Sequence, residues 1–61
     1  MNQLSEKELS YLNDSLHEEE LLVKKYQMLA NQSQDPEMKQ KLEQVSKRHQ
    51  SHFNELYSLL G

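Results

Sequence analysis

The sequence predicts an all-α fold in which two long helices form an antiparallel hairpin. The 61 residues include one Gly, one Pro and no Trp, and Glu, Gln, Lys and Leu are abundant, a composition typical of helices. Apolar residues recur at alternating steps of three and four in two separate segments, which is the periodicity of a helical seam. A helix-start signal, Asp35-Pro36-Glu37, lies between the segments. We therefore predict a single domain over residues 1–61.

The first helix is predicted over residues 5–32. Ser5 and Glu8 have the spacing of a capping box, in which the serine oxygen accepts the Glu8 backbone N–H and the Glu8 carboxylate reaches back to the Ser5 N–H. Beyond this start, the heptad seam contains Leu9, Leu12, Leu16, Glu19, Val23, Tyr26 and Ala30.

The turn is predicted at residues 33–35 and the second helix at residues 36–60. Asp35 suits the N-cap and Pro36 suits the first helical position, where its missing N–H does no harm. The seam of this helix contains Met38, Leu42, Val45, His49, His52, Leu56 and Leu59. Gly61 ends the helix.

The two seams match each other when the chain folds back near residue 34. Residues equally distant from that point lie at one level, so the numbers of each facing pair sum to 68. This register places Glu19 opposite His49 and Leu16 opposite His52. It predicts that His49 has a carboxylate partner and that His52 has none.

A hairpin of this size needs further burial. A 61-residue chain buries too little apolar surface to fold comfortably alone, and without cysteine it has no disulfide. Leu22 and Leu29 flank the first seam, and Phe53 and Leu60 flank the second, which widens the apolar stripe beyond that of a two-stranded coil. We therefore expect a homodimer in which two hairpins form a four-helix bundle.

Several function classes find no support in the sequence. The net charge is −3, and basic residues are dispersed among acidic ones, which argues against nucleic-acid binding. We expect no membrane span and no secretion signal, hence a cytoplasmic location. The sequence has no Gly-rich phosphate loop, no Cys nucleophile and no Ser-His-Asp set that could converge on two helices. We therefore do not expect an enzyme.

The polar residues of the seam, Glu19, His49 and His52, are candidate metal ligands. Two imidazoles and a carboxylate suit Zn²⁺ or another divalent transition metal, with a fourth position open to water. A metal-free polar layer that sets helix register is an equally good interpretation. His17 lies beside the seam and is expected at the surface, and Tyr26 is expected to pack in the core.

Four segments carry a resemblance to known families: LSEKELSYL (4–12), EELLVKKY (19–26), QDPEMK (34–39) and HQSHFNEL (49–56). The Glu and Tyr spacing of the first helix, followed by a His in the second, resembles half of a ferritin-like, rubrerythrin-type four-helix bundle. The segments together are similar to small spore-coat (coat F-like) proteins of endospore-forming bacteria. The spore-coat resemblance implies a spore-associated location and other coat or assembly proteins as partners.

The ferritin-like resemblance also implies site residues. In that family, one Glu from each of two helices and a Glu-x-x-His from each of the other two hold a di-metal centre. Glu19 matches the lone Glu, Tyr26 the nearby Tyr and His52 the His, whereas His49 stands at the position of the second Glu. A dimer would offer two carboxylates and four imidazoles, which disfavours ferric iron and favours Zn²⁺, Cu²⁺ or Ni²⁺.

Three functions follow as hypotheses. The first is a structural or assembly module, associated with a spore coat and built as a homodimeric four-helix bundle. The second is a small metal-binding protein that uses Glu19, His49 and His52. The third is a helical adaptor that binds another protein through Leu21, Leu22 and Met28 on the first helix.

Overall fold

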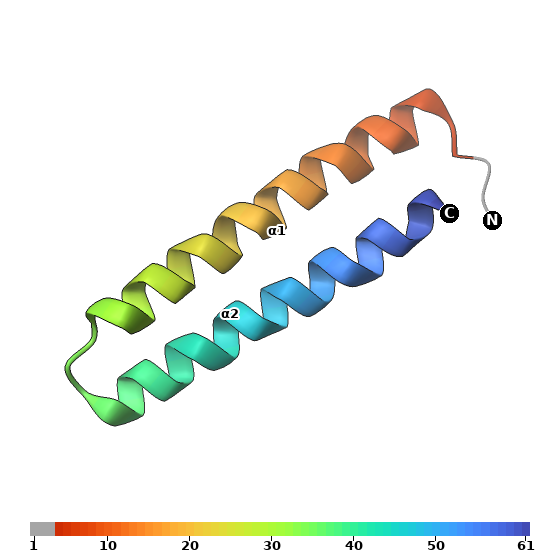
Figure 1. Cartoon of the computed structure of the whole chain (residues 1–61). Coiled ribbons are helices and arrows are strands. Elements are labelled where there is room, and N and C mark those ends of the chain that lie inside the picture. The colour runs from red at the N-terminus through yellow and green to blue at the C-terminus, as the bar shows by residue number, and fades with distance from the viewer. Residues whose placement is uncertain (1–3) are drawn as a thin grey trace.

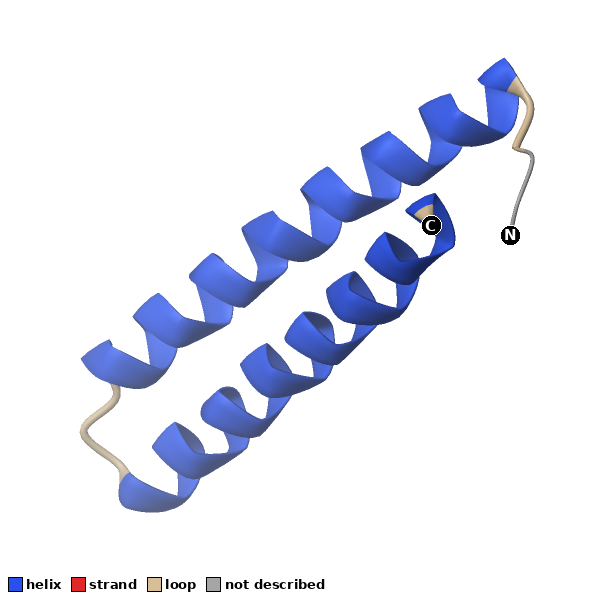
Figure 2. Ribbon diagram, turned by 45° about the vertical axis from the view of Figure 1, so that its right-hand side comes forward, coloured by secondary structure: helices blue, strands red, loops and turns tan. Residues whose placement is uncertain are grey.

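A computed structural model describes residues 4–61 as two long helices that lie side by side and run in opposite directions (Figures 1 and 2). Helix α1 spans Glu6–Gln32, helix α2 spans Pro36–Tyr57, and a 3₁₀ turn, η1, covers Ser58–Leu60. The described residues contain no strand. The predicted all-α hairpin is confirmed.

The predicted capping box begins α1. The Ser5 N–H donates to Glu8 Oε1 at 3.0 Å, and the Glu8 N–H donates to Ser5 Oγ at 3.1 Å. These two bonds satisfy backbone donors that the first turn of a helix leaves without partners. The hydrogen bond from the Ser5 backbone, together with that from its side chain, lowers the pKa of the Glu8 carboxyl.

Three residues connect the helices. Ser33 Oγ donates to the Asp35 carbonyl at 3.2 Å, and Asp35 Oδ1 accepts the Glu37 N–H at 3.3 Å. Asp35 is the N-cap of α2 and Pro36 its first residue, as predicted. Because the connection is so short, the helices must pack as antiparallel neighbours.

The C-terminal end of α2 differs slightly from the prediction. The α-helix ends at Tyr57, and residues 58–60 form the tighter 3₁₀ turn instead of continuing the α-helix to residue 60. Ser58 Oγ donates to the Glu55 carbonyl at 2.6 Å and so satisfies one carbonyl of the last turn. Gly61 follows with a φ of +118°, a conformation that favours glycine.

The contact between the helices is narrow. Leu12 and Ala30 are the buried apolar residues, with exposures of 6% and 1%, and Ser46 is buried at 7%. Most of the predicted seam is half-buried or buried, whereas four of its positions are exposed: Leu9, Met38, His52 and Leu59. Within residues 4–61, no large side chain is completely buried.

The shape of the hairpin explains this shallow core. Its principal extents are 46 × 16 × 10 Å and its radius of gyration is 14.3 Å, against about 10.5 Å for a compact domain of this length. The accessible surface is 4918 Å², roughly 700 Å² more than a globular monomer of 7.3 kDa exposes. The hairpin therefore exposes surface that a compact fold of its size would bury.

The hairpin has two broad sides, which we name face A and face B. Face A contains Tyr11, Leu22 and Leu29 of α1, Met38, Val45 and His52 of α2, and Leu59 of η1. A groove joins the two helices on this side, and it is lined by Leu4, Glu8, Tyr11, Leu12, Ser15, Leu56 and Leu59.

Face B contains Leu9, Leu16 and Val23 of α1, Ser46 and Phe53 of α2, and Leu60 of η1. A groove in which Val23 and Phe53 both line the wall joins the helices here. The predicted flanking rows, Leu22 with Leu29 and Phe53 with Leu60, therefore lie on opposite sides of the hairpin. Neither helix in the described part of the chain carries an apolar stretch long enough to cross a membrane.

Candidate metal centre

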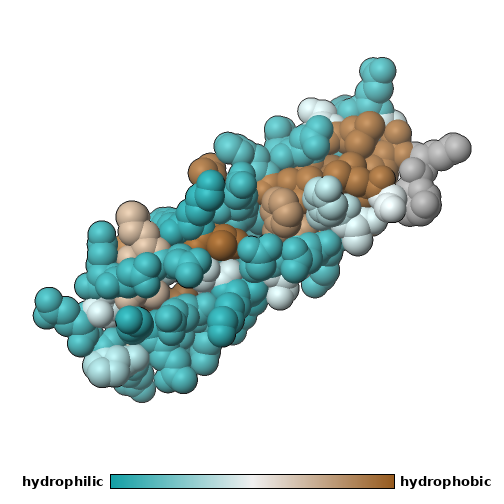
Figure 3. Space-filling view, viewed as in Figure 1, coloured by the Kyte–Doolittle hydropathy of each residue, from teal (hydrophilic) through white to brown (hydrophobic). Residues whose placement is uncertain are grey.

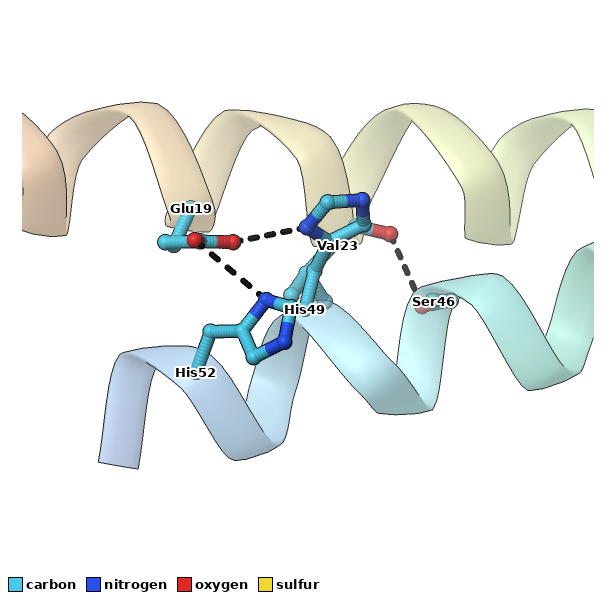
Figure 4. A network of polar contacts seen from close by, with 5 residues as sticks. All are labelled: Glu19, Val23, Ser46, His49 and His52. Carbon is cyan, nitrogen blue, oxygen red and sulfur yellow. Dashed lines mark hydrogen bonds and ion pairs between the residues drawn. The ribbon is translucent and has the colours of Figure 1, made fainter. Parts of the chain in front are cut away.

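The polar cluster lies at the middle of the hairpin. Glu19 is the central residue of α1, with 13 residues of the helix before it and 13 after it. His49 and His52 project from neighbouring turns of α2 towards its carboxylate (Figure 4). His49 Nδ1 lies 2.7 Å from Glu19 Oε1, and His52 Nδ1 lies 3.4 Å from Glu19 Oε2. The predicted Glu19–His49 pair is therefore confirmed.

The prediction for His52 was wrong. It placed His52 opposite Leu16 with no carboxylate partner, whereas the imidazole contacts the second oxygen of Glu19. The level of a residue on its helix does not fix where its side chain ends. Glu19 has a flexible stem and two oxygens, so one carboxylate reaches two imidazoles on successive turns of α2.

Burial differs within the cluster. The side chains of Glu19 and His49 are 19% and 22% exposed, whereas that of His52 is 46% exposed. Glu19 and His49 therefore lie between the helices, and His52 leaves the cluster open on face A. The one polar contact of Glu19 that is well shielded from water is the bond to His49.

Aromatic rings surround His49. The Tyr26 ring stacks on it with centroids 5.8 Å apart and an interplanar angle of 14°. His52 meets it edge to face at 5.5 Å. Lys25 Nζ lies 5.6 Å from the centroid of Tyr26. Tyr26 and His52 thus flank the His49 ring. Tyr26 was expected to pack in the core, and it lies half-buried in the seam between the helices.

The donor atoms are close enough to share one ion. Glu19, His49 and His52 each offer a ligand atom, and these atoms lie within 4.8 Å of one another. A tetrahedral zinc site with bonds of about 2.0–2.1 Å places its ligand atoms about 3.3 Å apart. The donor atoms that lie farthest apart would therefore have to approach by up to about 1.5 Å to hold such an ion.

The chemistry of the donors selects the kind of metal. Two imidazole nitrogens and one carboxylate suit Zn²⁺, Cu²⁺ or Ni²⁺, whereas Mg²⁺ and Ca²⁺ prefer oxygen ligands. Three protein ligands leave a coordination position open to water or to another molecule. The exposed edge of His52 puts that position on face A.

The same contacts also form a complete polar layer without an ion. One oxygen of the Glu19 carboxylate can accept a hydrogen bond from His49, and the other lies within ion-pair distance of His52, so both oxygens have partners. The geometry therefore fits both of the interpretations that the sequence left open. His17 lies outside the cluster, as predicted: it is 68% exposed and reaches Glu20 at 4.0 Å.

Ser46 is a structural residue that the sequence analysis missed. Its hydroxyl donates to the Val23 carbonyl of α1 at 3.0 Å, one turn of α2 before His49 (Figure 4). Because the side chain is small and makes its hydrogen bond across the interface, the backbones can approach closely there. The available signal was the seven-residue interval from Ser46 to Phe53 and from Phe53 to Leu60. The heptad assignment treated this row as flanking the seam.

Comparisons of this chain with protein families, characterised proteins and solved structures found no match. The ferritin-like and spore-coat resemblances remain expectations based on the segments quoted above. The candidate metal centre is argued from its geometry alone.

Proposed function

We propose that this chain is a structural assembly module whose working form is a homodimeric four-helix bundle. The observation that carries the proposal is the narrow core: Leu12 and Ala30 are the buried apolar residues of the described chain. Tyr11, Met38 and Leu59 are 58%, 52% and 41% exposed. A second hairpin packed against such residues would bury them and stabilise both copies.

The surface area supports the same proposal. Each hairpin exposes 4918 Å², roughly 700 Å² above the value for a compact monomer of its mass. A standard protein interface buries about 800 Å² on each partner, so one dimer contact would bring the exposed surface to the ordinary range. We also propose that the module is associated with a spore coat, and the support for this association is the sequence resemblance alone.

Sedimentation of the purified chain at micromolar concentration tests the dimer. We expect a twofold mass that falls on dilution, with helicity falling in parallel. Leu22 lies on face A and is half-buried, whereas its neighbour Leu21 is 51% exposed and points away from the seam. We expect Leu22→Lys to yield monomer and the matched Leu21→Lys to leave the dimer intact. A well-folded wild-type monomer would overturn the proposal.

We propose metal binding as a second function of the same protein. Its support is the convergence of Glu19, His49 and His52, whose ligand atoms lie within 4.8 Å of one another. These residues come from two helices that a three-residue turn holds together, so the site is largely formed before an ion arrives. Such preorganisation lowers the entropic cost of binding.

Calorimetric titration of chelator-treated protein without a His tag tests this function. We expect one Zn²⁺ per chain, competition by Cu²⁺ and Ni²⁺, and no competition by millimolar Mg²⁺. His52→Ala is the informative variant because His52 is the most exposed ligand and its removal disturbs the core least. His17→Ala is the matched control. Absence of stoichiometric Zn²⁺ binding would exclude the function.

A further inference from the structure

We propose that a second copy of this chain covers face A in antiparallel orientation, with the twofold axis crossing the hairpin at the level of Glu19 and His49. The inference rests on the proposed dimer and adds which face is used, which way the copies run and what meets at the axis. Two observations support the face and the direction, namely the distribution of apolar residues and the charges beside face A, and the central position of the polar cluster gives the level of the axis.

Face A carries apolar side chains in each part of its length, on either side of the polar His52. Near the turn it presents Leu29 and Met38, in the middle Leu22 and Val45, and near the termini Tyr11 and Leu59. An antiparallel partner brings the turn end of one copy against the terminal end of the other. That arrangement buries apolar surface throughout only if both halves of the face are apolar, and face A meets this requirement.

Face B does not. Figure 4 views the hairpin from face A, on which His52 projects, and α1 runs there from left to right. In Figures 1 and 3 α1 runs from right to left, so these figures view the hairpin from the opposite side, face B. The apolar surface in Figure 3 gathers over the half that holds the termini, and polar side chains cover most of the half near the turn. Polar and charged residues line the grooves of the middle and turn half: Glu20, Lys24, Gln27, Glu43, Lys47 and Gln50.

The central position of Glu19 fixes the level of the axis. A twofold axis across an antiparallel pair of equal hairpins passes through their midpoint when the overlap is complete. The midpoint of α1 is Glu19, and the second arm, residues 36–60, has its midpoint at residue 48, next to His49. Full overlap therefore brings the polar clusters of both copies to one level.

Charges beside face A favour this direction. In the antiparallel arrangement α1 lies along α1 of the other copy and α2 along α2. Asp14 and Lys25, five residues before and six after Glu19, then oppose each other across the interface. Lys41 and Glu55, seven residues on either side of position 48, do the same. Each pair occurs twice in a dimer, which gives four attractive contacts.

The other twofold arrangement has its axis along the bundle and places α1 beside α2 of the second copy. Lys25 then lies near Lys41, and Asp14 lies near Glu55, since residues whose numbers sum to about 68 share a level. Each of these repulsions occurs twice. In this arrangement Glu18 and Arg48 of opposite copies form an attractive contact, which also occurs twice. In the antiparallel arrangement each of these two residues lies near the same residue of the other copy, which gives two repulsive contacts. The antiparallel arrangement thus has four attractive and two repulsive contacts, whereas the arrangement with the axis along the bundle has two attractive and four repulsive contacts.

The docking also completes the surroundings of the candidate metal centre. His52 is the exposed member of the cluster, and in the antiparallel arrangement Val45 of the second copy lies at its level. Met38 and Leu59 of opposite copies meet in the same way. The open side of each cluster then faces the interior of the bundle instead of bulk water.

Cross-linking tests the orientation, because the natural chain has no cysteine. In one hairpin Met38 and Leu59 are 21 residues apart on the second arm, about 30 Å along the helix, too far for a short thiol-reactive cross-linker. In the proposed dimer they are neighbours. We expect the M38C/L59C variant to give dimers carrying two cross-links.

The control variant Q40C/S58C places its two cysteines 18 residues apart on the outer surface of α2 and η1, and we expect it to remain uncross-linked. Cross-linking of the single variant M38C would indicate the axis along the bundle, and cross-linking of F53C would indicate face B; either result would overturn the inference. Sedimentation separates the two proposals. A dimer with the wrong cross-links refutes only the orientation, whereas a monomer refutes the assembly function itself.

Discussion

Glu19→Gln is the substitution that separates the carboxylate charge from the shape of the side chain. Glu19 lies 2.7 Å from His49 and 3.4 Å from His52 and is 19% exposed. Glutamine has nearly the same volume and retains a carbonyl oxygen, so the packing between α1 and α2 is preserved. The charge and the stronger metal ligand are lost.

Two effects of different size are expected. Replacing a charge-assisted hydrogen bond by a neutral one lowers the free energy of unfolding by about 1 kcal/mol, which corresponds to roughly 4–8 °C in Tm for a domain of this size. Loss of a direct ligand weakens Zn²⁺ binding by at least about 100-fold, since even residues that only orient a ligand contribute about 10–100-fold. The stabilisation by Zn²⁺, about 2.7 kcal/mol at one hundred times Kd, should therefore nearly disappear.

The assay is thermal unfolding by circular dichroism with and without Zn²⁺, together with calorimetric titration. Glu20→Gln is the matched control, because Glu20 is the next residue, is 52% exposed and reaches Lys24 only at 3.9 Å. We expect this control to bind Zn²⁺ like the wild type. Undiminished Zn²⁺ affinity in Glu19→Gln, or an equal loss in Glu20→Gln, would refute the assignment of Glu19 as a ligand.

Three further predictions address the polar layer, the helix contact and the N-terminal cap. His49→Leu with His52→Leu should unfold at lower urea concentration because Glu19 loses both partners, and adding Glu19→Leu should restore or exceed wild-type stability; a stable double variant would contradict this. Ser46→Ala should cost about 1 kcal/mol in urea unfolding, and Ser46→Leu clearly more because the backbones must separate; equal costs would contradict close approach. The lowered pKa of Glu8 means that its cap stabilises the helix above the pKa of an unfolded Glu and is lost as the pH falls through the folded value; the amide protection factors of the first turn, corrected for the intrinsic exchange rate at each pH, should fall along this profile in the wild type and not in Glu8→Gln.

Most of the fold could be predicted from local signals in the sequence. The capping box at Ser5, the start signal at Asp35 and Pro36, and the alternating apolar steps depend on neighbouring residues, so they can be read from one chain without knowledge of the packing. The facing pair Glu19–His49 followed from register alone, because a three-residue turn permits little freedom between the helices.

Other features depend on distances that register does not contain. The contact of His52 with Glu19 requires the length of the carboxylate side chain and the position of its second oxygen. The role of Ser46 requires the separation of the backbones, since a serine in a polar sequence context also suits the solvent-facing side of a helix. Which side of the hairpin Phe53 and Leu22 occupy depends on the handedness of both helices together.

The stacking of Tyr26 on His49 allows ion binding at the candidate metal centre to be followed by tyrosine fluorescence. The chain has three tyrosines and no tryptophan, so tyrosine emission is not lost by energy transfer to an indole. Tyr26 is the tyrosine whose ring lies 5.8 Å from an imidazole of the cluster. A paramagnetic Cu²⁺ ion held by His49 would quench its emission, and the diamagnetic Zn²⁺ would not. The hairpin thus contains an intrinsic fluorescent reporter of which ion occupies its middle, and it needs no attached dye.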